Sequence, residues 1–353
     1  MKNLIIPAAG KSTRFPGMKP KWLLKHPDGD LMVAKSIKGI NYNDAENIFL
    51  IVLEEHIRNF CNNSTDVIMK SFKELGIDKK LKIVILNEYT NSQPETVKTA
   101  IERENIRGSI FIKDVDSYFE CFVSDKNAVY TFDLNKMDLV HAKNKSYVQI
   151  DDKNFITNIV EKKVISSKFC VGGYGFNSAQ EFLKCYSTFD PKKEFYISHM
   201  IFKMLLNQLQ FISVNVENYI DWGTAKEWNN FRNNYANVFI EIDGILRKKS
   251  ETGIGNSLPI QKNIDKINWL YKTGNVKVIL TTSKSKQEAT LLKSQLDKLG
   301  IYYHSIIFDL FYAKKIIISD YNNTNPYKNC DAINIKTNSI ELSDMLDHCM
   351  RCE

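Results

Sequence analysis

Short apolar runs alternate with amphipathic segments over the first two thirds of the chain. Residues 4–6 form the first run, and residues 95–103 carry a helical pattern between two later ones. The further runs cover residues 48–52, 81–85 and 109–112. Short, almost entirely apolar runs are typical of strands that are buried on both faces of a parallel sheet. The pattern predicts an α/β fold whose ligands bind at the carboxyl ends of the strands.

Strand patterns become more frequent after residue 128 and then change character near residue 235. They cover residues 129–133, 147–151, 158–161 and 170–176. A β-rich part of this kind is typical of substrate-binding inserts in α/β enzymes. We expect a Rossmann-like domain with a mixed, mostly parallel sheet over residues 1–234, followed by a smaller α/β domain over residues 235–353.

Composition places the chain among ordinary globular proteins. Its 353 residues suffice for two domains, with 43% hydrophobic and 25% charged side chains. No stretch approaches the ~20 apolar residues of a membrane helix. The seven cysteines are scattered and odd in number, and no signal-peptide pattern precedes the first strand. These features predict free thiols and a cytoplasmic location.

The net charge of +7 is spread over short clusters. No long basic stripe and no interleaving of basic and aromatic residues marks a nucleic-acid interface, so we expect no nucleic-acid partner. A mild positive field does favour phosphorylated small molecules.

The loop after the first predicted strand combines small residues with two cations. Ala8, Ala9 and Gly10 leave backbone N–H groups open to an anion or a base edge. Arg14 lies just beyond them, and Lys21 lies in the segment behind. Because both cations can converge on one polyphosphate, the segment predicts a triphosphate site without a Walker A loop.

This segment resembles the opening signature of the nucleotidyltransferases that make activated sugars and related head groups, L-x-A-A-G-x-G-[TS]-R followed by P-K-x-L. The matching residues are Ala8, Ala9, Gly10, Thr13, Arg14, Pro20, Lys21 and Leu23. Ser12 stands where the family usually has its second glycine, although its backbone N–H can still donate. The resemblance implies that Arg14 and Lys21 are catalytic and that the nucleotide contacts Ala8, Ala9, Gly10, Ser12 and Thr13. The alternative is a generic glycine turn with surface basic residues.

A polar turn before the helix at residues 95–103 is the next candidate. The family has a turn here that contacts the base, which implies nucleotide-binding roles for Ser92 and Gln93. Helix capping explains Ser92 about as well.

Two aspartates, Asp114 and Asp116, follow the strand at residues 109–112. Mg²⁺ binds one or two carboxylates together with phosphate oxygens and water. We expect Asp116 to be the direct ligand and Asp114 to lie behind it or to contact the ribose. An Asx turn is the alternative.

The family also carries D-x-G-T near the end of its catalytic domain, matched by Asp221, Gly223 and Thr224, which implies that Asp221 completes the metal site.

The acceptor side is implied by an E-K pair and a glycine-rich strand. Glu161 and Lys162 match the pair that contacts sugar hydroxyls and the acceptor phosphate in the family, and Gly173 and Tyr174 match the strand of the pocket floor. Glu194 and Ser198 are weaker candidates for the same pocket. A solvent-exposed E-K pair is the alternative, because such pairs are common.

The C-terminal third resembles haloacid dehalogenase-type phosphatases, on three motifs in order. A strand runs into Asp243-Gly244, a second ends at Thr281-Thr282-Ser283, and a third, residues 315–318, runs into Ser319-Asp320. Glu241 replaces the nucleophilic aspartate of that family. A longer carboxylate misplaces the attacking oxygen, and about 1 Å can cost about 100-fold in rate. We therefore expect this domain to be non-catalytic.

Together these residues predict a Mg²⁺-dependent nucleotidyltransferase that acts on a sugar phosphate or small alcohol phosphate, for capsule or other surface polysaccharide. The compact catalytic domain favours CTP, and UTP or dTTP with a hexose 1-phosphate stays open. A D-x-D glycosyltransferase and a non-catalytic sensor are the rival interpretations. Neither needs the triphosphate site predicted at Gly10, Arg14 and Lys21, so both are disfavoured. A homo-oligomer is compatible with the sequence.

Overall fold

The computed structural model describes residues 2–137, 142–249, 258–320 and 330–350. The chain divides into two compact units, Met1–Ala225 and Lys226–Glu353. The division falls at the start of helix α7 (Ala225–Arg232), before the boundary expected at residue 234. Among the described residues, no helix has the length and apolar character needed to span a bilayer.

The first unit is built around a mixed sheet whose strand order is β10-β6-β9-β4-β1-β2-β3. Strands β4, β1, β2 and β3 run parallel, and β9 pairs antiparallel with both β4 and β6. This arrangement confirms the predicted mixed α/β fold. The strands are β1 (Asn3–Pro7), β2 (Asn47–Leu53), β3 (Leu81–Leu86), β4 (Ile110–Lys113), β6 (Ala128–Asp133), β9 (Lys168–Phe176) and β10 (Ile212–Asn215).

A hairpin extends this sheet beside β9. Strand β7 (Ser146–Ile150) pairs antiparallel with β8 (Ile156–Glu161) and touches β9 through Tyr147 and Phe169. The β-rich pattern after residue 128 therefore forms the antiparallel half of the sheet, as expected for an insert on a parallel core.

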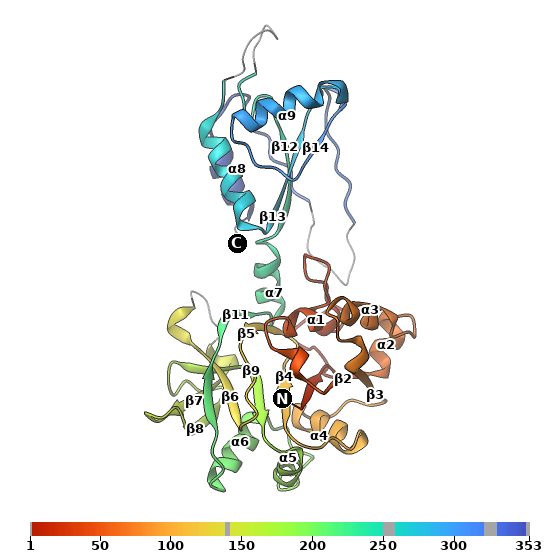
Figure 1. Ribbon diagram of the computed structural model, residues 1–353, viewed down its shortest axis with the longest axis vertical. Coiled ribbons are helices and arrows are strands. Elements are labelled where there is room, and N and C mark those ends of the chain that lie inside the picture. The colour runs from red at the N-terminus through yellow and green to blue at the C-terminus, as the bar shows by residue number, and fades with distance from the viewer. Residues whose placement is uncertain (1, 138–141, 250–257, 321–329, 351–353) are drawn as a thin grey trace. The chain divides into compact units, whose positions relative to one another are not determined.

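Helices cover the sheet on both faces, which explains the continuous apolar runs (Figure 1). Leu4 and Ile6 of β1 face one core with α1 (Met32–Ile37), α2 (Glu54–Phe60) and α3 (Asp66–Glu74). Ile5 faces the other core, with α4 (Gln93–Arg103), α5 (Ala179–Tyr186) and α6 (Ile197–Leu206). Neighbouring side chains of one strand thus serve two separate cores.

A two-stranded antiparallel ribbon, separate from the main sheet, begins just after the carboxyl end of β4. Strand β5 (Ser117–Glu120) pairs antiparallel with β11 (Glu217–Asp221). Gly39 packs directly beneath β5, because a Cβ at Gly39 would lie 2.1 Å from the carbonyl oxygen of Phe119. The position of the ribbon therefore depends on a glycine contributed by the segment after α1.

The second unit has a parallel sheet of order β12-β13-β14. Its strands are β12 (Ala236–Glu241), β13 (Val276–Thr281) and β14 (Ser305–Ile307), and its further helices are α8 (Gln261–Thr273), α9 (Ala289–Lys298) and α10 (Leu342–Met350). Its core contains apolar residues of both sheet and helices, such as Ile240, Leu270 and Leu296. The first two expected strands of this unit are confirmed.

The expected strand over residues 315–318 is wrong. This segment has no strand pairing in the structure, and Ile316 and Ile318 are 76% and 93% exposed. A run of β-branched residues has a high strand propensity, but without a neighbouring strand edge its backbone gains no ladder hydrogen bonds. The acidic residue after it, Asp320, therefore does not end a strand.

The contact beneath β5 predicts the effect of one substitution. Gly39→Ala would force the β5 backbone to move, so we expect the free energy of unfolding to fall by about 3 kcal/mol in urea-induced unfolding. Gly76→Ala is the control, because a Cβ there meets nothing within 4 Å and only its φ of +74° is unfavourable. The control should lose about 1 kcal/mol. Equal losses in the two variants would contradict the close contact.

Candidate functional site

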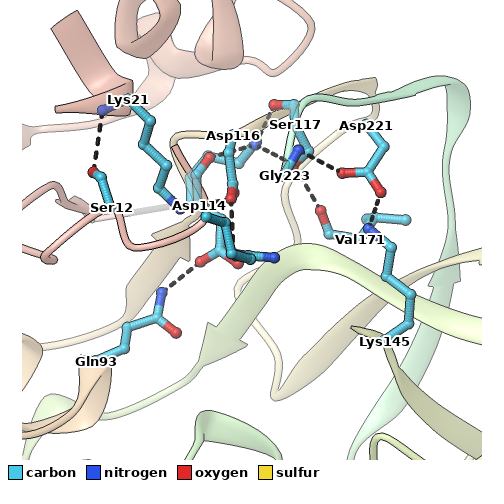
Figure 2. A network of polar contacts seen from close by, with 12 residues as sticks. Ser12, Lys21, Gln93, Asp114, Asp116, Ser117, Lys145, Val171, Asp221 and Gly223 are labelled. Atoms are coloured by element: carbon cyan, nitrogen blue, oxygen red, sulfur yellow. Dashed lines mark hydrogen bonds and ion pairs between the residues drawn. The ribbon is translucent and has the colours of Figure 1, made fainter. Parts of the chain in front are cut away.

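The loop after β1 brings the two halves of the N-terminal signature together. Ser12 has a φ of +50°, a left-handed conformation that glycine adopts more easily. Its hydroxyl oxygen accepts a hydrogen bond from the Lys21 N–H at 3.1 Å (Figure 2). The serine thus keeps the glycine-like backbone of the signature, and its side chain fixes the start of the segment that carries Lys21.

Asp114 and Asp116 follow β4 at the adjacent strand end, where a buried lysine supports their loop. Lys113 is fully buried, and its ammonium donates to the carbonyl oxygens of Asp114 (2.7 Å) and Ser117 (2.8 Å). Burial lowers the pKa of Lys113 to about 8, although Asp114 and Asp116 oppose this shift. Lys113 was not among the predicted site residues, because its only signal in the sequence is a cation at the end of a strand that is buried on both faces.

The Asp116 carboxylate receives the two cations of the N-terminal loop. Lys21 Nζ lies 2.6 Å from Asp116 Oδ2 (Figure 2). Arg14 Nη2 lies 3.3 Å from the same oxygen. Burial disfavours the charged form of Asp116, but Lys21 and Arg14 outweigh it and hold the pKa well below its usual range. The expected convergence of Arg14 and Lys21 is therefore present, and in this structure it is directed at Asp116.

Asp114 is held by groups other than those that hold Asp116. Gln93 Nε2 donates to its Oδ1 at 2.5 Å, and its backbone N–H donates to the carbonyl oxygen of Gly172 at 2.8 Å. Burial, together with the neighbouring Asp116, raises the pKa of Asp114 to about 6. Gly172 has a φ of +85°, and a Cβ there would lie 2.6 Å from Asp114 Oδ2. The glycine is therefore required by the close approach of the Asp114 carboxylate.

The turn expected to read the base is also part of the helix start. The Ser92 hydroxyl accepts from the Glu95 N–H at 3.3 Å as the cap of α4. Ser92 and Gln93 both line the cleft described below, so capping and nucleotide contact are compatible at this turn.

The ribbon of β5 and β11 brings Asp221 beside the D-x-D loop. Asp221 is in register with Ser117, and the Trp222 N–H donates to the carbonyl oxygen of Asp116 at 2.9 Å. The Asp221 carboxylate accepts from the Gly223 N–H through Oδ1 (3.0 Å) and pairs with Lys145 through Oδ2 (Figure 2). Two carboxylates that are distant in sequence thus lie on neighbouring backbone segments.

The residues expected on the acceptor side gather around Glu161. Its carboxylate accepts from the hydroxyls of Ser146 and Ser198. Lys162 Nζ donates to the Tyr196 hydroxyl at 2.6 Å, and Tyr196 donates to Glu194 at 3.0 Å. Ser146, Tyr196 and Lys145 were not expected; they lie in ordinary polar segments that give no sequence signal.

A single cleft of about 750 Å³ joins these groups. The predicted site residues that line it are Ala8, Ala9, Gly10, Ser12, Thr13, Arg14, Lys21, Ser92, Gln93, Asp114, Asp116, Glu161, Lys162, Tyr174 and Asp221. Gly173 is not among its described lining residues. A Cβ at Gly173 would lie 2.8 Å from the Phe119 ring, so this glycine serves packing. Of these two neighbouring glycines of β9, Gly172 is the one that lines the cleft.

No family model matches this sequence, and no curated protein sequence matches it significantly. Solved structures do share its fold over about the length of the first unit. A nucleoside-diphosphate-sugar pyrophosphorylase from Vibrio cholerae RC9 is similar over 65% of this chain and 98% of its own, with a TM-score of 0.54 and 22% identity. An inositol-1-phosphate CTP transferase from T. maritima is similar over 64% of this chain and 91% of its own (TM-score 0.53, 16% identity).

A UDP-glucose pyrophosphorylase in complex with UDP-glucose is similar over 65% of this chain and 97% of its own (TM-score 0.52, 13% identity). At these identities the likeness establishes the fold of the first unit. What the fold is used for here depends on the residues of the cleft.

A second, smaller cleft of about 290 Å³ lies at the carboxyl ends of β12 and β13. Glu241 and the hydroxyls of Thr281, Thr282 and Ser283 line it, and Lys315 Nζ pairs with Glu241 at 2.7 Å. Asp320 is not among its described lining residues. The haloacid dehalogenase-like character of this unit, and its lack of catalysis, stay predictions.

Phosphate release tests the expected inactivity of this second cleft. The wild-type chain and Glu241→Gln should release phosphate from p-nitrophenyl phosphate at the same background rate, because the Glu241 carboxylate is held by Lys315. The measurement is malachite-green detection with Mg²⁺ present. A wild-type rate about tenfold above that of Glu241→Gln would make the prediction wrong. Glu241→Asp, assayed in parallel, tests whether the length of the carboxylate is the missing element.

Proposed function

We propose that this chain is a nucleotidyltransferase that moves a nucleotidyl group from a nucleoside triphosphate to a small phosphorylated acceptor and releases pyrophosphate. The observation that carries the proposal is the convergence of Arg14 and Lys21 on Asp116 at the carboxyl ends of β1 and β4. Two cations that meet at one point of an open cleft suit a chain of phosphates, and the acceptor-side residues line the same cleft.

The nucleotide end of the cleft is built from the N-terminal loop. In our proposal Arg14 holds the β- and γ-phosphates, because its guanidinium is half exposed and its planar donors suit phosphate oxygens. Ala9 and Gly10 offer their backbone N–H groups to the nucleotide in this proposal, and the space beside Gly10 is open, since a Cβ there would meet nothing within 4 Å. The Ala8 N–H, which was also expected to be open, donates to the carbonyl oxygen of Ile51 at 2.8 Å. Ser92 and Gln93 face the base.

The reaction needs little covalent chemistry from the protein. An oxygen of the acceptor phosphate attacks the α-phosphorus, an O–P bond forms, and the bond to the pyrophosphate oxygen breaks in line. A phosphate dianion is already a nucleophile, so no general base is required, and positioning with charge neutralisation dominates. Lys21 lies between the two phosphates and offsets their repulsion.

The donor set suits Mg²⁺, which requires one or two carboxylates when phosphate and water complete its coordination. Within the described residues no group of three or more His, Cys, Asp or Glu side chains is placed to hold a metal ion. Asp116 and Asp221 supply two carboxylates on neighbouring segments, and we propose them as the ligands. A Mg²⁺ ion held by Asp116 and Asp221 would supply charge neutralisation at the α-phosphate.

The acceptor half fits a phosphate that carries hydroxyl groups. Glu161 already accepts two serine hydroxyls, as it would those of a sugar or polyol, and Lys162 supplies the cation for its phosphate. We propose CTP as the nucleotide and surface polysaccharide as the use of the product, following the resemblance in the sequence.

Pyrophosphate release is the direct test. Each of ATP, GTP, CTP, UTP and dTTP is crossed with sugar and polyol phosphates in the presence of Mg²⁺. We expect one pair to give turnover that EDTA abolishes, and Lys21→Ala to lower kcat by at least about 100-fold because a transition-state contact is lost. The result also reports which nucleotide and acceptor the cleft takes.

Lys38→Ala is the matched control, since Lys38 also pairs with an aspartate, Asp30, but does not line the cleft. Its kcat should stay within about twofold of wild type. Triphosphate binding is measured in parallel by calorimetry. The absence of triphosphate binding, or equal losses in the two lysine variants, would contradict the proposed function.

A further inference from the structure

Lys145 is a partly buried cation of the cleft to which the proposed reaction gives no role. Its ammonium pairs with Asp221 Oδ2 and donates to the Tyr219 hydroxyl at 2.7 Å (Figure 2). The side chains of Lys145 and Asp221 are 14% and 11% exposed, so water screens this pair only in part. Lys145 directly precedes β7, and both it and Asp221 line the cleft.

Both oxygens of Asp221 are therefore engaged. Oδ1 accepts from the Gly223 N–H at 3.0 Å, which fixes the orientation of the carboxylate, and Oδ2 faces the Lys145 ammonium. A divalent cation that approaches Oδ2 meets a positive charge already in contact with that oxygen. At separations of a few ångströms in a partly buried site, such repulsion is large enough to lower cation affinity.

Lys145 is the chain neighbour of a residue on the acceptor side. Ser146, the next residue, donates to Glu161 on the acceptor side of the cleft. An ammonium on a flexible four-carbon stem can move from a carboxylate to a phosphate without a backbone change. The acceptor phosphate is a dianion, and in the proposed reaction it must approach the metal-bound α-phosphate.

We propose that Lys145 is a positioning residue that couples cation binding to acceptor binding. It neutralises Asp221 while the acceptor half is empty; when the acceptor phosphate arrives, the ammonium pairs with it, and Asp221 Oδ2 is left to the divalent cation. The proposal rests on the proposed function, because it takes its acceptor and its cation from that reaction. The coupling is reciprocal: the acceptor tightens cation binding by the factor by which the cation tightens acceptor binding.

A static counter-ion would behave differently. If Lys145 only held Asp221 in place, its removal would disorder the carboxylate and weaken cation binding. If it competes with the cation, its removal strengthens cation binding. The sign of the change in cation affinity separates the two roles.

The test measures Mn²⁺ binding to the full chain by the loss of the free-ion electron paramagnetic resonance signal, without nucleotide or turnover. Inorganic phosphate is the probe for the acceptor, and its own complexation of Mn²⁺ is measured in buffer. In wild type, phosphate should lower the Kd for Mn²⁺ by about tenfold, within the usual range of coupling between sites. In Lys145→Met the Kd should be about tenfold lower than in wild type without phosphate, and phosphate should add nothing.

Three variants complete the design. Lys145→Arg keeps the charge and should retain the wild-type Kd, whereas Lys145→Gln repeats the test should the methionine variant fold poorly. Lys162→Met removes the other acceptor-side lysine, which donates to the Tyr196 hydroxyl and, within the described ranges, has no carboxylate at hydrogen-bond distance. This variant should leave the phosphate-free Kd for Mn²⁺ unchanged.

A Kd for Mn²⁺ that is unchanged or higher in Lys145→Met and Lys145→Gln would overturn the proposal. Absence of Mn²⁺ binding in both wild type and these variants would overturn it as well. Since no nucleotide is present, neither result bears on pyrophosphate release, and a failure of the pyrophosphate assay would leave the sign of the Mn²⁺ effect interpretable.

Discussion

The buried charge of Asp116 is the constraint on which the cleft depends. A carboxylate taken out of water stays ionised only when cations face it, and here both cations come from the N-terminal loop. The loop after β1 is thereby tied to the loop after β4, although a hundred residues separate them in sequence. The Ser12 hydroxyl holds the backbone of Lys21, and the Lys21 ammonium pairs with Asp116. The conformation of the loop at Ser12 therefore affects the position of a charge in the cleft.

The second aspartate is placed by strand pairing. The register of β5 with β11 sets Asp221 opposite Ser117, and the Trp222 N–H then reaches the carbonyl oxygen of Asp116. A shift of this register by one residue would turn Asp221 to the other face of the ribbon. Two further contacts fix the position of β5. Gly39 packs against the backbone of Phe119, and the buried Lys113 ammonium donates to the carbonyl oxygen of Ser117.

The apolar runs of the sequence predicted the parallel core, because strands buried on both faces leave a pattern that neighbouring loops do not disturb. Arg14 and Lys21 were predicted from the N-terminal signature, and Asp116 from its place after a buried strand. That Asp116 itself faces both cations is visible only in the structure. The sequence gives no such signal for Lys145, because its partner Asp221 lies on β11 and is brought to it only by the fold. Residues 315–318 are the opposite case. Their β-branched side chains favour a strand, but in the structure they pair with no neighbouring strand.

The ion pairs of the cleft also bear on selectivity among anions. Asp116 faces Lys21 and Arg14, and Asp221 faces Lys145. Each of these three cations therefore already has a carboxylate partner in the protein. A singly charged anion, or free phosphate, must separate one of these pairs to enter and brings no compensating positive charge for the aspartate it displaces. A polyphosphate that arrives with its divalent cation supplies both signs at once. If the proposed function holds, the cleft can therefore stand open to a solution rich in simple anions and still bind a nucleoside triphosphate.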